Sequence, residues 1–178
     1  AYTGSLLKEV IEKAIEHSLG GLEVLAGIPG TLGGAISGNA GAYGKSISNF
    51  IQKGTIIDEE GKEKEVNREY FQFDYRWSRL KKSREIILSA KLKLKRGSRK
   101  LILKRIEEIF QDRERKHPPS DVSCAGSYFK NIKLPDGNFI PAGYLLEKVS
   151  DKTIKVGGAA VYEKHANFLI NKGGASCK

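Results

Sequence analysis

Hydrophobic positions recur every three or four residues near the start of the chain. Leu7, Val10, Ile11 and Ala14 follow this spacing, and two glycines come directly after it. Apolar residues at these intervals share one face of a helix, so the pattern predicts a helix over residues 5–18. The next apolar run has the character of a short strand, and it leads into a stretch rich in glycine.

Alternating apolar and polar positions predict strands in the middle of the chain. Residues 51–66 have the pattern of a hairpin with its turn at Glu60-Gly61-Lys62. Between residues 85 and 95, alanine and leucines alternate with lysines, which predicts a strand with one buried and one solvated face. The break at residues 96–98 then marks the expected boundary between two domains, residues 1–97 and 98–178.

Helical spacing returns after this break. Residues 99–116 form a predicted amphipathic helix, ended by two prolines, with one apolar side made by Ile102, Ile106, Ile109 and Phe110. A turn is expected at 135–138, a helix from Pro141 to Val149, and strands at 153–156 and 167–170. Helices and strands in two parts indicate an α+β fold.

Composition limits the class of protein. Hydrophobic residues make up 39% of the 178 residues, which is enough for a packed core. Neither an apolar run of membrane-spanning length nor a signal peptide is evident, and the chain contains no methionine, which favours an internal piece of a longer polypeptide. Cys124 and Cys177 lack metal-ligand spacing; two thiols favour a reduced, cytoplasmic protein, while a disulfide between them stays an alternative.

The net charge of +10 attracts anions such as nucleic acid, an acidic membrane or a phosphorylated small molecule. Lysine and glutamate are both abundant, so a solvated charged surface explains much of this charge equally well. A basic nucleic-acid-binding module stays an alternative, but the aromatic residues fall mostly in apolar runs rather than among exposed basic ones. We therefore expect neither a nucleic-acid nor a membrane partner.

Residues 27–44, GIPGTLGGAISGNAGAYG, contain seven glycines in eighteen positions. The stretch lacks the lysine and hydroxyl ending of a P-loop and the spacing of a dinucleotide fingerprint. Small residues nevertheless let backbone amides approach a phosphate or a flat ring closely. Contact with a ligand and an ordinary glycine-rich turn are both consistent with this composition.

Several polar residues could carry chemistry. The fork of Arg76 can hold a carboxylate by two parallel bonds. Arg113 and Lys116 lie at the end of the basic helix, where a solvated charged face is the alternative. Ser127 begins a run of five residues that also holds a lysine and an asparagine. A serine can donate a proton beside a carbanion-like centre, although a turn stabilised by polar side chains would have the same composition.

The histidines do not indicate a metal site. His117 and His165 have neither a helical histidine partner nor a nearby cysteine cluster, so structural roles are expected for both. Residues 164–167, KHAN, are predicted to be a loop whose side chains connect neighbouring elements.

Six motifs, in this order and spacing, resemble the UDP-N-acetylenolpyruvoylglucosamine reductase (MurB) family: GIPGTLGGAISGNAGAYG, DYRWS, RERKHP, AGSYFKN, IPAGYLLEKV and EKHANFLIN. The resemblance covers nearly the whole chain, and the set is specific although each motif alone is not. It implies the second lobe of a vanillyl-alcohol-oxidase-type FAD-binding fold in residues 1–97, followed by a small α+β substrate-binding domain in residues 98–178.

The resemblance also implies an activity. In this family NADPH reduces FAD, and the reduced flavin passes hydride to the enolpyruvyl group of a UDP-sugar, giving UDP-N-acetylmuramate for peptidoglycan and thus for cell wall growth and division. By motif match, Ser127 is the catalytic proton donor and Arg76 holds the substrate carboxylate. Implied substrate contacts are Tyr43, Lys116, Lys130 and Asn131. Implied cofactor contacts are Gly27, Ile28, Pro29, Gly30, Thr31, Gly33, Gly34 and Arg113.

Departures from the family pattern refine these expectations. The short interval between Arg76 and Ser127 is similar to the type II branch, which lacks a substrate-closing loop, and residues 121–124 lack the usual proline. The family's N-terminal FAD subdomain and C-terminal catalytic glutamate are expected outside this chain, which alone would be inactive. We expect a monomer without a metal. Another vanillyl-alcohol-oxidase-type flavoprotein is the main alternative, but it would not explain AGSYFKN.

Overall fold

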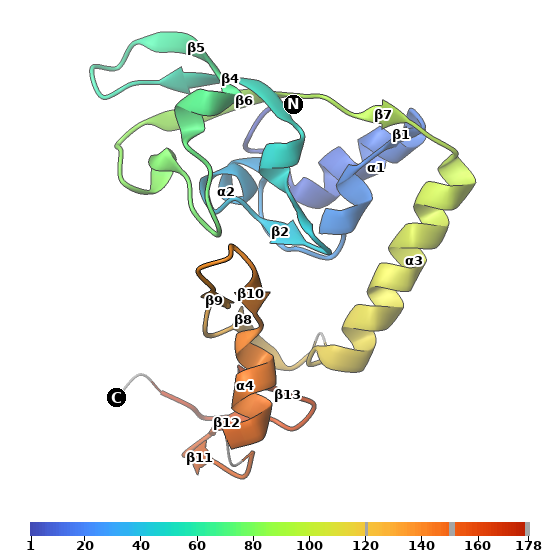
Figure 1. Ribbon diagram of the computed structural model, residues 1–178, viewed down its shortest axis with the longest axis vertical. Helices are drawn as coiled ribbons and strands as arrows, with labels where there is room; N and C mark the ends of the chain where they lie inside the picture. The colour runs from blue at the N-terminus through green and yellow to red at the C-terminus, as the bar shows by residue number, and fades with distance from the viewer. Residues whose placement is uncertain (120, 150–151, 177–178) are drawn as a thin grey trace. The chain divides into compact units, whose positions relative to one another are not determined.

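The structure is a computed structural model that describes residues 1–119, 121–149 and 152–176. The chain divides into two compact units, Ala1–Phe110 and Gln111–Lys178, so the division falls within helix α3 (Arg99–Lys116) (Figure 1). The boundary expected near residue 97 separates cofactor-binding from substrate-binding roles, which packing does not test, and it stays a prediction. Cys177, one partner of the alternative disulfide, lies outside the described residues; Cys124 is exposed.

The first unit is built around an antiparallel sheet of order β5-β4-β6 (Figure 1). Two smaller antiparallel pairs, β1 with β7 and β2 with β3, complete its sheet structure. Short 3-10 helices connect several of these elements. The helices and strands of the unit, besides α3, are α1 (Leu7–Glu16), β1 (Leu19–Gly20), α2 (Leu32–Ser37), β2 (Gly41–Ala42), β3 (Lys45–Ser46), β4 (Ile51–Ile57), β5 (Glu63–Asn67), β6 (Ile86–Leu92) and β7 (Lys95–Arg96).

Most elements predicted from long periodic patterns are present in this unit. The first helix is confirmed as α1, and the hairpin is confirmed as β4 and β5. The short run Leu22–Leu25 is instead a 3-10 helix, so the expected strand is wrong there. Both leucines and Val24 are buried. A strand would send neighbouring side chains to opposite faces, whereas the helical turn directs all three into the core.

The core of the first unit anchors the glycine-rich stretch. Leu32 and Ile36 of α2 are fully buried together with Leu7, Ile56 and Phe71. Burying two large apolar side chains favours a fixed position for α2, since each such burial contributes about 1.5–3 kcal/mol. The stretch is therefore part of the packed domain rather than a flexible linker.

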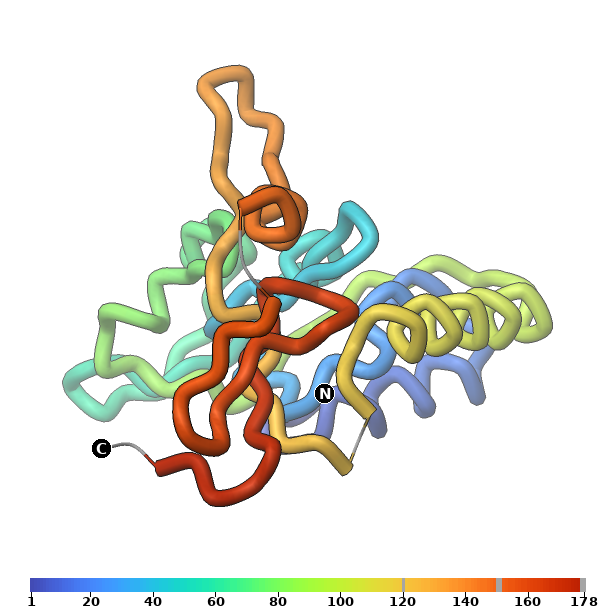
Figure 2. Tube along the Cα trace, turned by 90° about the horizontal axis from the view of Figure 1, so that it is seen from below, coloured from blue at the N-terminus to red at the C-terminus, as the bar shows by residue number. Residues whose placement is uncertain are grey.

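The second unit contains a sheet of order β11-β12-β13-β8, with α4 packed against β13. Its small core is formed by Ala160, Tyr162, Phe168 and Ile170. A separate hairpin, β9 with β10, extends from the unit next to α4 (Figure 2). The strands and helix are β8 (Ser123–Ser127), β9 (Ile132–Lys133), β10 (Phe139–Ile140), α4 (Ala142–Val149), β11 (Lys155–Val156), β12 (Ala159–Tyr162) and β13 (His165–Asn171).

The predicted helices of the later chain are also confirmed, as α3 and α4. Of the residues on the predicted apolar side of α3, Ile102 and Ile109 are buried, whereas Phe110 is 51% exposed. Of the strand expected at 153–156, only residues 155–156 form a strand, which is β11. The strand expected at 167–170 is confirmed within the longer β13. Mixed helices and sheets in both units confirm the α+β class.

Candidate functional site

The beginning of α2 is fixed by hydrogen bonds inside the first unit. Thr31 caps the helix, its Oγ1 accepting a hydrogen bond from the Gly34 amide at 3.1 Å. The amides of Leu32 and Gly33 donate to the carbonyls of Ser5 and Thr3, at 2.9 and 2.8 Å. These three amides are therefore used within the chain, and any contact of Gly33 or Gly34 with a ligand would involve other atoms.

The loop just before α2 has an open surface. Gly30 is exposed and has a φ of 109°, a conformation that side-chain-bearing residues rarely adopt. A Cβ atom placed there would meet nothing within 4 Å, while the Gly30 carbonyl is held by the Leu7 amide at 2.9 Å. The backbone from Gly27 to Thr31 is thus fixed in place yet accessible, as close approach by a flat ring requires.

Arg76 lies in a tight turn of the first unit. Asp74 and Trp77 close this turn with two reciprocal backbone hydrogen bonds of 3.1 Å. Arg76 itself has a left-handed φ of 53°, and its carbonyl accepts a hydrogen bond from the Lys81 ammonium at 2.9 Å. This conformation costs free energy in a residue other than glycine, so the surrounding contacts must hold it.

The Arg76 turn is attached to the glycine-rich stretch. Asn39 donates from Nδ2 to the Asp74 carbonyl, and the Ser78 hydroxyl donates to the Ser37 carbonyl, both at 2.8 Å. Asn39 and Ser78 are buried. Neither was predicted as a site residue. The available signal was their position inside two motifs, because a buried polar residue must find a partner.

The Arg76 guanidinium also lies close to the end of this stretch. A Cβ atom added to Gly41 would lie 3.2 Å from Nη1 of Arg76 and only 2.8 Å from the Lys45 carbonyl. Two segments that were considered separately in the sequence are therefore neighbours in the first unit. Glycine at position 41 is required by this close approach.

We expect Gly41→Ala to destabilise the first unit by about 1–3 kcal/mol, because the new methyl group must displace the Lys45 backbone. Thermal or urea unfolding measures the loss. Gly38→Ala is the matched control: Gly38 has an ordinary right-handed conformation, and its nearest Cβ contact is 3.4 Å. Equal stability of the two variants would contradict the close packing at Gly41.

Tyr43 lies in the turn between β2 and β3 and is 39% exposed. The guanidinium of Arg105, on α3, lies 5.5 Å from the centre of its ring, within the range of a cation–π contact. The first unit therefore holds Tyr43, within the glycine-rich stretch, and Arg76, in the turn attached to that stretch. Their roles as substrate contacts stay predictions.

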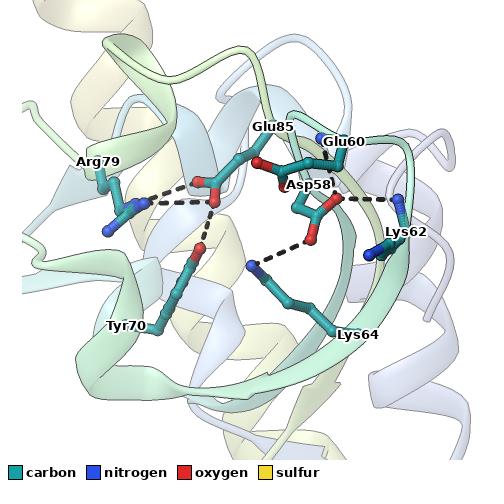
Figure 3. A network of polar contacts seen from close by, with 7 residues as sticks. All are labelled: Asp58, Glu60, Lys62, Lys64, Tyr70, Arg79 and Glu85. Atoms are coloured by element: carbon teal, nitrogen blue, oxygen red, sulfur yellow. Dashed lines mark hydrogen bonds and ion pairs between the residues drawn. The ribbon is translucent and has the colours of Figure 1, made fainter.

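A polar network centred on the buried Glu85 supports the segments on either side of the Arg76 turn (Figure 3). The Glu85 side chain is 2% exposed and forms an ion pair with Nε of Arg79 at 3.1 Å. The Tyr70 hydroxyl donates a second hydrogen bond to this carboxylate, and the Arg79 guanidinium lies 4.6 Å from the Tyr70 ring centre. Tyr70 precedes the turn and Arg79 follows it, so Glu85 connects both flanks.

The network sets the protonation of its members. Burial raises the pKa of Glu85, but the hydrogen bond from Tyr70 and the Arg79 guanidinium outweigh burial, so the pKa lies below its ordinary value. Burial and the adjacent carboxylate raise the pKa of Tyr70. Glu85 is therefore charged, and Tyr70 protonated, at neutral pH.

We expect Tyr70→Phe to lower the free energy of unfolding by about 2 kcal/mol at neutral pH, because the buried carboxylate loses a donor. A depressed pKa contributes stability above the unfolded-state pKa, and this contribution is lost as pH falls through the folded-state value. The difference between variant and parent should therefore shrink in acid. Urea unfolding of both proteins from neutral pH down to acid measures this difference, with Tyr2→Phe, at an exposed position, as the control. A difference in unfolding free energy that does not change with pH would contradict this role for Glu85.

In the second unit, Ser127 is exposed at the end of β8, where it pairs with Phe168 of β13. Lys130 is exposed three residues after the end of the strand, next to Phe129. Asn131 has a local role, since its Oδ1 accepts a hydrogen bond from the Ala142 amide at the beginning of α4, at 3.2 Å. The unit thus gathers the hydroxyl, ammonium and amide groups on one connected segment, and their contact with substrate stays a prediction.

The motif KHAN was expected to be a loop, and this expectation is wrong for residues 165–167, which belong to β13. Its expected role of connecting elements is confirmed. The Asn167 side chain binds the main chain of Phe129 through both of its polar atoms, at 2.8 and 2.9 Å. Sequence reasoning did not include Asn167 among the site residues.

Cationic groups gather at the end of α3 in the second unit. Within the described part of the chain, Nε of Arg113 is buried and has no hydrogen-bond partner. Lys116 forms an ion pair with Asp112 at 2.8 Å. Burial, reinforced by the nearby Arg113, lowers the pKa of His117, and burial also lowers the pKa of His165. Both imidazoles are therefore neutral at neutral pH. Among the described residues Nε of Arg113 is an unused donor, which suits an anion or a carbonyl.

Comparison with known proteins identifies the fold and the motifs. Residues 117–178 match the model of the UDP-N-acetylenolpyruvoylglucosamine reductase C-terminal domain, and residues 1–67 match an FAD binding domain. A UDP-N-acetylenolpyruvoylglucosamine reductase from Carboxydothermus hydrogenoformans is 43% identical over 99% of this chain and 56% of its own length. The chain belongs to the UDP-N-acetylenolpyruvoylglucosamine reductase family.

Other members of this reductase family are also similar to this chain over nearly its whole length. A reductase of the same name from Clostridium perfringens is 39% identical over all of this chain and 57% of its own. The crystal structure of UDP-N-acetylenolpyruvylglucosamine reductase (MurB) from Thermus caldophilus is similar with a TM-score of 0.82 and 32% identity, covering 97% of this chain and 61% of that one. The chain spans a little over half the length of the curated relatives it matches.

Two further properties concern the described residues alone. None of the helices there is both long enough and apolar enough to cross a membrane. Among the same residues, three or more histidine, cysteine or acidic side chains do not come together in a group that could hold a metal ion.

Proposed function

We propose that the protein containing this chain reduces UDP-N-acetylenolpyruvoylglucosamine to UDP-N-acetylmuramate, with FAD as cofactor and NADPH as the source of electrons. Family membership supports this proposal, because all the relatives named above are reductases of this substrate. The observation that carries it within the structure is the attachment of the Arg76 turn to the glycine-rich stretch, which joins a carboxylate-binding group to a candidate cofactor loop.

The residues present fit a flavin. The backbone around Gly30 is accessible, and the match to an FAD binding domain includes it. Residues 27–31 would lie against the flavin. Gly33 and Gly34, whose amides are used within the chain, would contact it through other atoms. The buried Nε of Arg113, which has no hydrogen-bond partner among the residues that the structure describes, would donate to a polar atom of a ligand, and the cofactor is the partner we assign to it. When bound, FAD carries two electrons from NADPH to the substrate.

Arg76 and Ser127 are the proposed catalytic residues. Addition of hydride to the enolpyruvyl double bond moves an electron pair toward the carboxylate, forming an enolate. The Arg76 guanidinium holds this group by parallel hydrogen bonds and stabilises the charge as it develops. The Ser127 hydroxyl then transfers its proton to the carbon next to the carboxylate, completing the saturated product. Water returns a proton to the serine oxygen.

The remaining assignments concern the UDP-sugar. Lys130 is exposed and its ammonium suits a phosphate, whereas Lys116 must exchange its ion pair with Asp112 for one with substrate. Asn131, whose Oδ1 accepts a hydrogen bond from the Ala142 amide, is also assigned to the UDP-sugar. Tyr43 provides an exposed aromatic face. A monomeric, cytoplasmic enzyme without nucleic-acid, membrane or metal partners completes the proposal.

Steady-state assay of a full-length protein carrying this chain tests the function. With FAD bound, we expect NADPH consumption only when the enolpyruvyl UDP-sugar is present, with one UDP-N-acetylmuramate formed per NADPH. Oxidation of an alcohol in place of this reaction would instead support another vanillyl-alcohol-oxidase-type flavoprotein. Salt-dependent binding to random DNA, with an absence of flavin, would favour the basic nucleic-acid-binding alternative.

A further inference from the structure

Asn167 holds the main chain directly after Ser127. It lies on β13 and is 3% exposed. Its Nδ2 donates to the Phe129 carbonyl at 2.9 Å, and its Oδ1 accepts from the Phe129 amide at 2.8 Å. The Asn167 carbonyl accepts a third hydrogen bond from the Tyr128 amide at 2.9 Å. One residue thus binds both positions that follow the serine.

These bonds extend the sheet beyond the end of β8. Strand pairing ends at Ser127, opposite Phe168. A side-chain amide carries the same donor and acceptor as a peptide group, so Asn167 provides the partner that a further strand residue would have supplied. Ser127 is therefore held by its own pairing with Phe168, and the chain two residues further on is held by the Asn167 side-chain amide.

Burial of side chains contributes little to holding this segment. The side chains of Tyr128 and Phe129 are 64% and 55% exposed, so they contribute little burial. Gly126, just before the serine, has a φ of 84°, which allows the chain to change direction there. With few apolar contacts, the position of Ser127 depends mainly on hydrogen bonds, and three of these belong to Asn167.

Asn167 is itself held in place. Its main-chain amide donates a hydrogen bond to Nδ1 of His165 at 3.2 Å. The His165 ring packs against Phe168, with 4.7 Å between ring centres, and closely approaches Gly143 of α4. Burial lowers the pKa of His165, which keeps Nδ1 available as an acceptor at neutral pH. The asparagine is thus fixed to a packed strand and helix rather than to a loop.

We propose that Asn167 is a positioning residue for Ser127, because its side-chain amide fixes the main chain of Phe129, two residues further on, and thereby the place of the Ser127 hydroxyl. The inference rests on the proposed function. Asn167 does not contact the reacting atoms in this account. Proton transfer depends on placement to within about 1 Å, and a displacement of that size costs about 100-fold in rate.

Two substitutions separate the contributions of the amide. Asn167→Asp keeps the size and the acceptor for the Phe129 amide, but it loses the donor and places a second oxygen against the Phe129 carbonyl. Asn167→Leu removes both bonds and keeps the same branching and number of side-chain heavy atoms. Asn171 offers matched controls on the same strand, since its side chain accepts from the Gly173 and Ala175 amides, at 2.8 and 3.3 Å, away from Ser127.

The half-reactions of the full-length protein, followed by flavin absorbance without oxygen, provide the test. Asn167→Asp should leave flavin reduction by NADPH unchanged and slow flavin reoxidation by the enolpyruvyl UDP-sugar about 100-fold. Asn171→Asp should leave both rates unchanged. Exchange of the Phe129 amide hydrogen should be faster in Asn167→Leu than in the parent; if that variant does not fold, the aspartate variant carries the test alone.

A second background distinguishes positioning from general damage. If Asn167 acts through Ser127, Asn167→Asp should cause no further loss of reoxidation rate in a Ser127→Ala protein. An equal loss in both backgrounds, or no loss in either, would overturn the role of Asn167 and leave the proposed function standing. If the substrate fails to reoxidise the flavin of the unsubstituted protein, the proposed function fails, and this inference fails with it.

Discussion

Ser127→Ala should separate the two half-reactions of the full-length protein. Without the hydroxyl, the proton donor for the carbon next to the carboxylate is lost, and general acid catalysis of this kind contributes about 10²–10⁴-fold. We therefore expect flavin reoxidation by the enolpyruvyl UDP-sugar to slow by about that factor. Reduction of the flavin by NADPH does not need this proton, so its rate should be unchanged. Rapid-mixing absorbance measurements without oxygen give both rates.

Ser123→Ala is the control for this experiment. Ser123 is also exposed and lies at the other end of β8, so its substitution removes the same hydroxyl from the same strand. It should leave both half-reactions unchanged. If Ser127→Ala slows the two half-reactions equally, the serine supports folding or cofactor binding, and its assignment as proton donor is wrong.

Arg76→Lys should lower kcat by about 10²–10³-fold, the loss typical of removing one donor from a site that stabilises developing negative charge. Lysine keeps the positive charge but cannot form two parallel bonds to a carboxylate. It has a side chain as arginine does, so the cost of the left-handed backbone at this position is similar and the substitution isolates the guanidinium. Steady-state kinetics with the enolpyruvyl UDP-sugar measure the change.

Both kinetic constants of the Arg76 variant are informative. Binding of the ground-state carboxylate should also weaken, so KM should rise while kcat falls. Arg84→Lys is a suitable control because Arg84 is exposed and outside the turn. A rise in KM with unchanged kcat would show that Arg76 binds substrate without stabilising the enolate, and would contradict its catalytic role.

Long periodic patterns predicted the framework accurately. The helix over residues 99–116 has these same bounds in the structure, since its apolar spacing persists over several turns and two prolines follow it. Leu22–Leu25 shows the limit of the same method. Four apolar and polar residues are too few to establish a period, and the core, rather than local preference, decided that they form a 3-10 helix.

The supporting contacts of the site could not be predicted from local patterns. Asn39 and Asp74 are 35 residues apart, and Asn167 and Phe129 are 38 apart. A polar residue in a motif indicates that a partner exists, but tertiary packing decides which one. The motifs therefore identified the segments that carry Arg76 and Ser127, whereas the residues that hold those segments required the structure.

Anaerobic titration of the pre-reduced, full-length protein with the enolpyruvyl UDP-sugar tests the central claim most directly. The account predicts that one equivalent of substrate restores the absorbance of oxidised flavin completely, with one equivalent of UDP-N-acetylmuramate formed. Flavin that stays reduced in the presence of substrate, and is reoxidised only when oxygen is admitted, would contradict it.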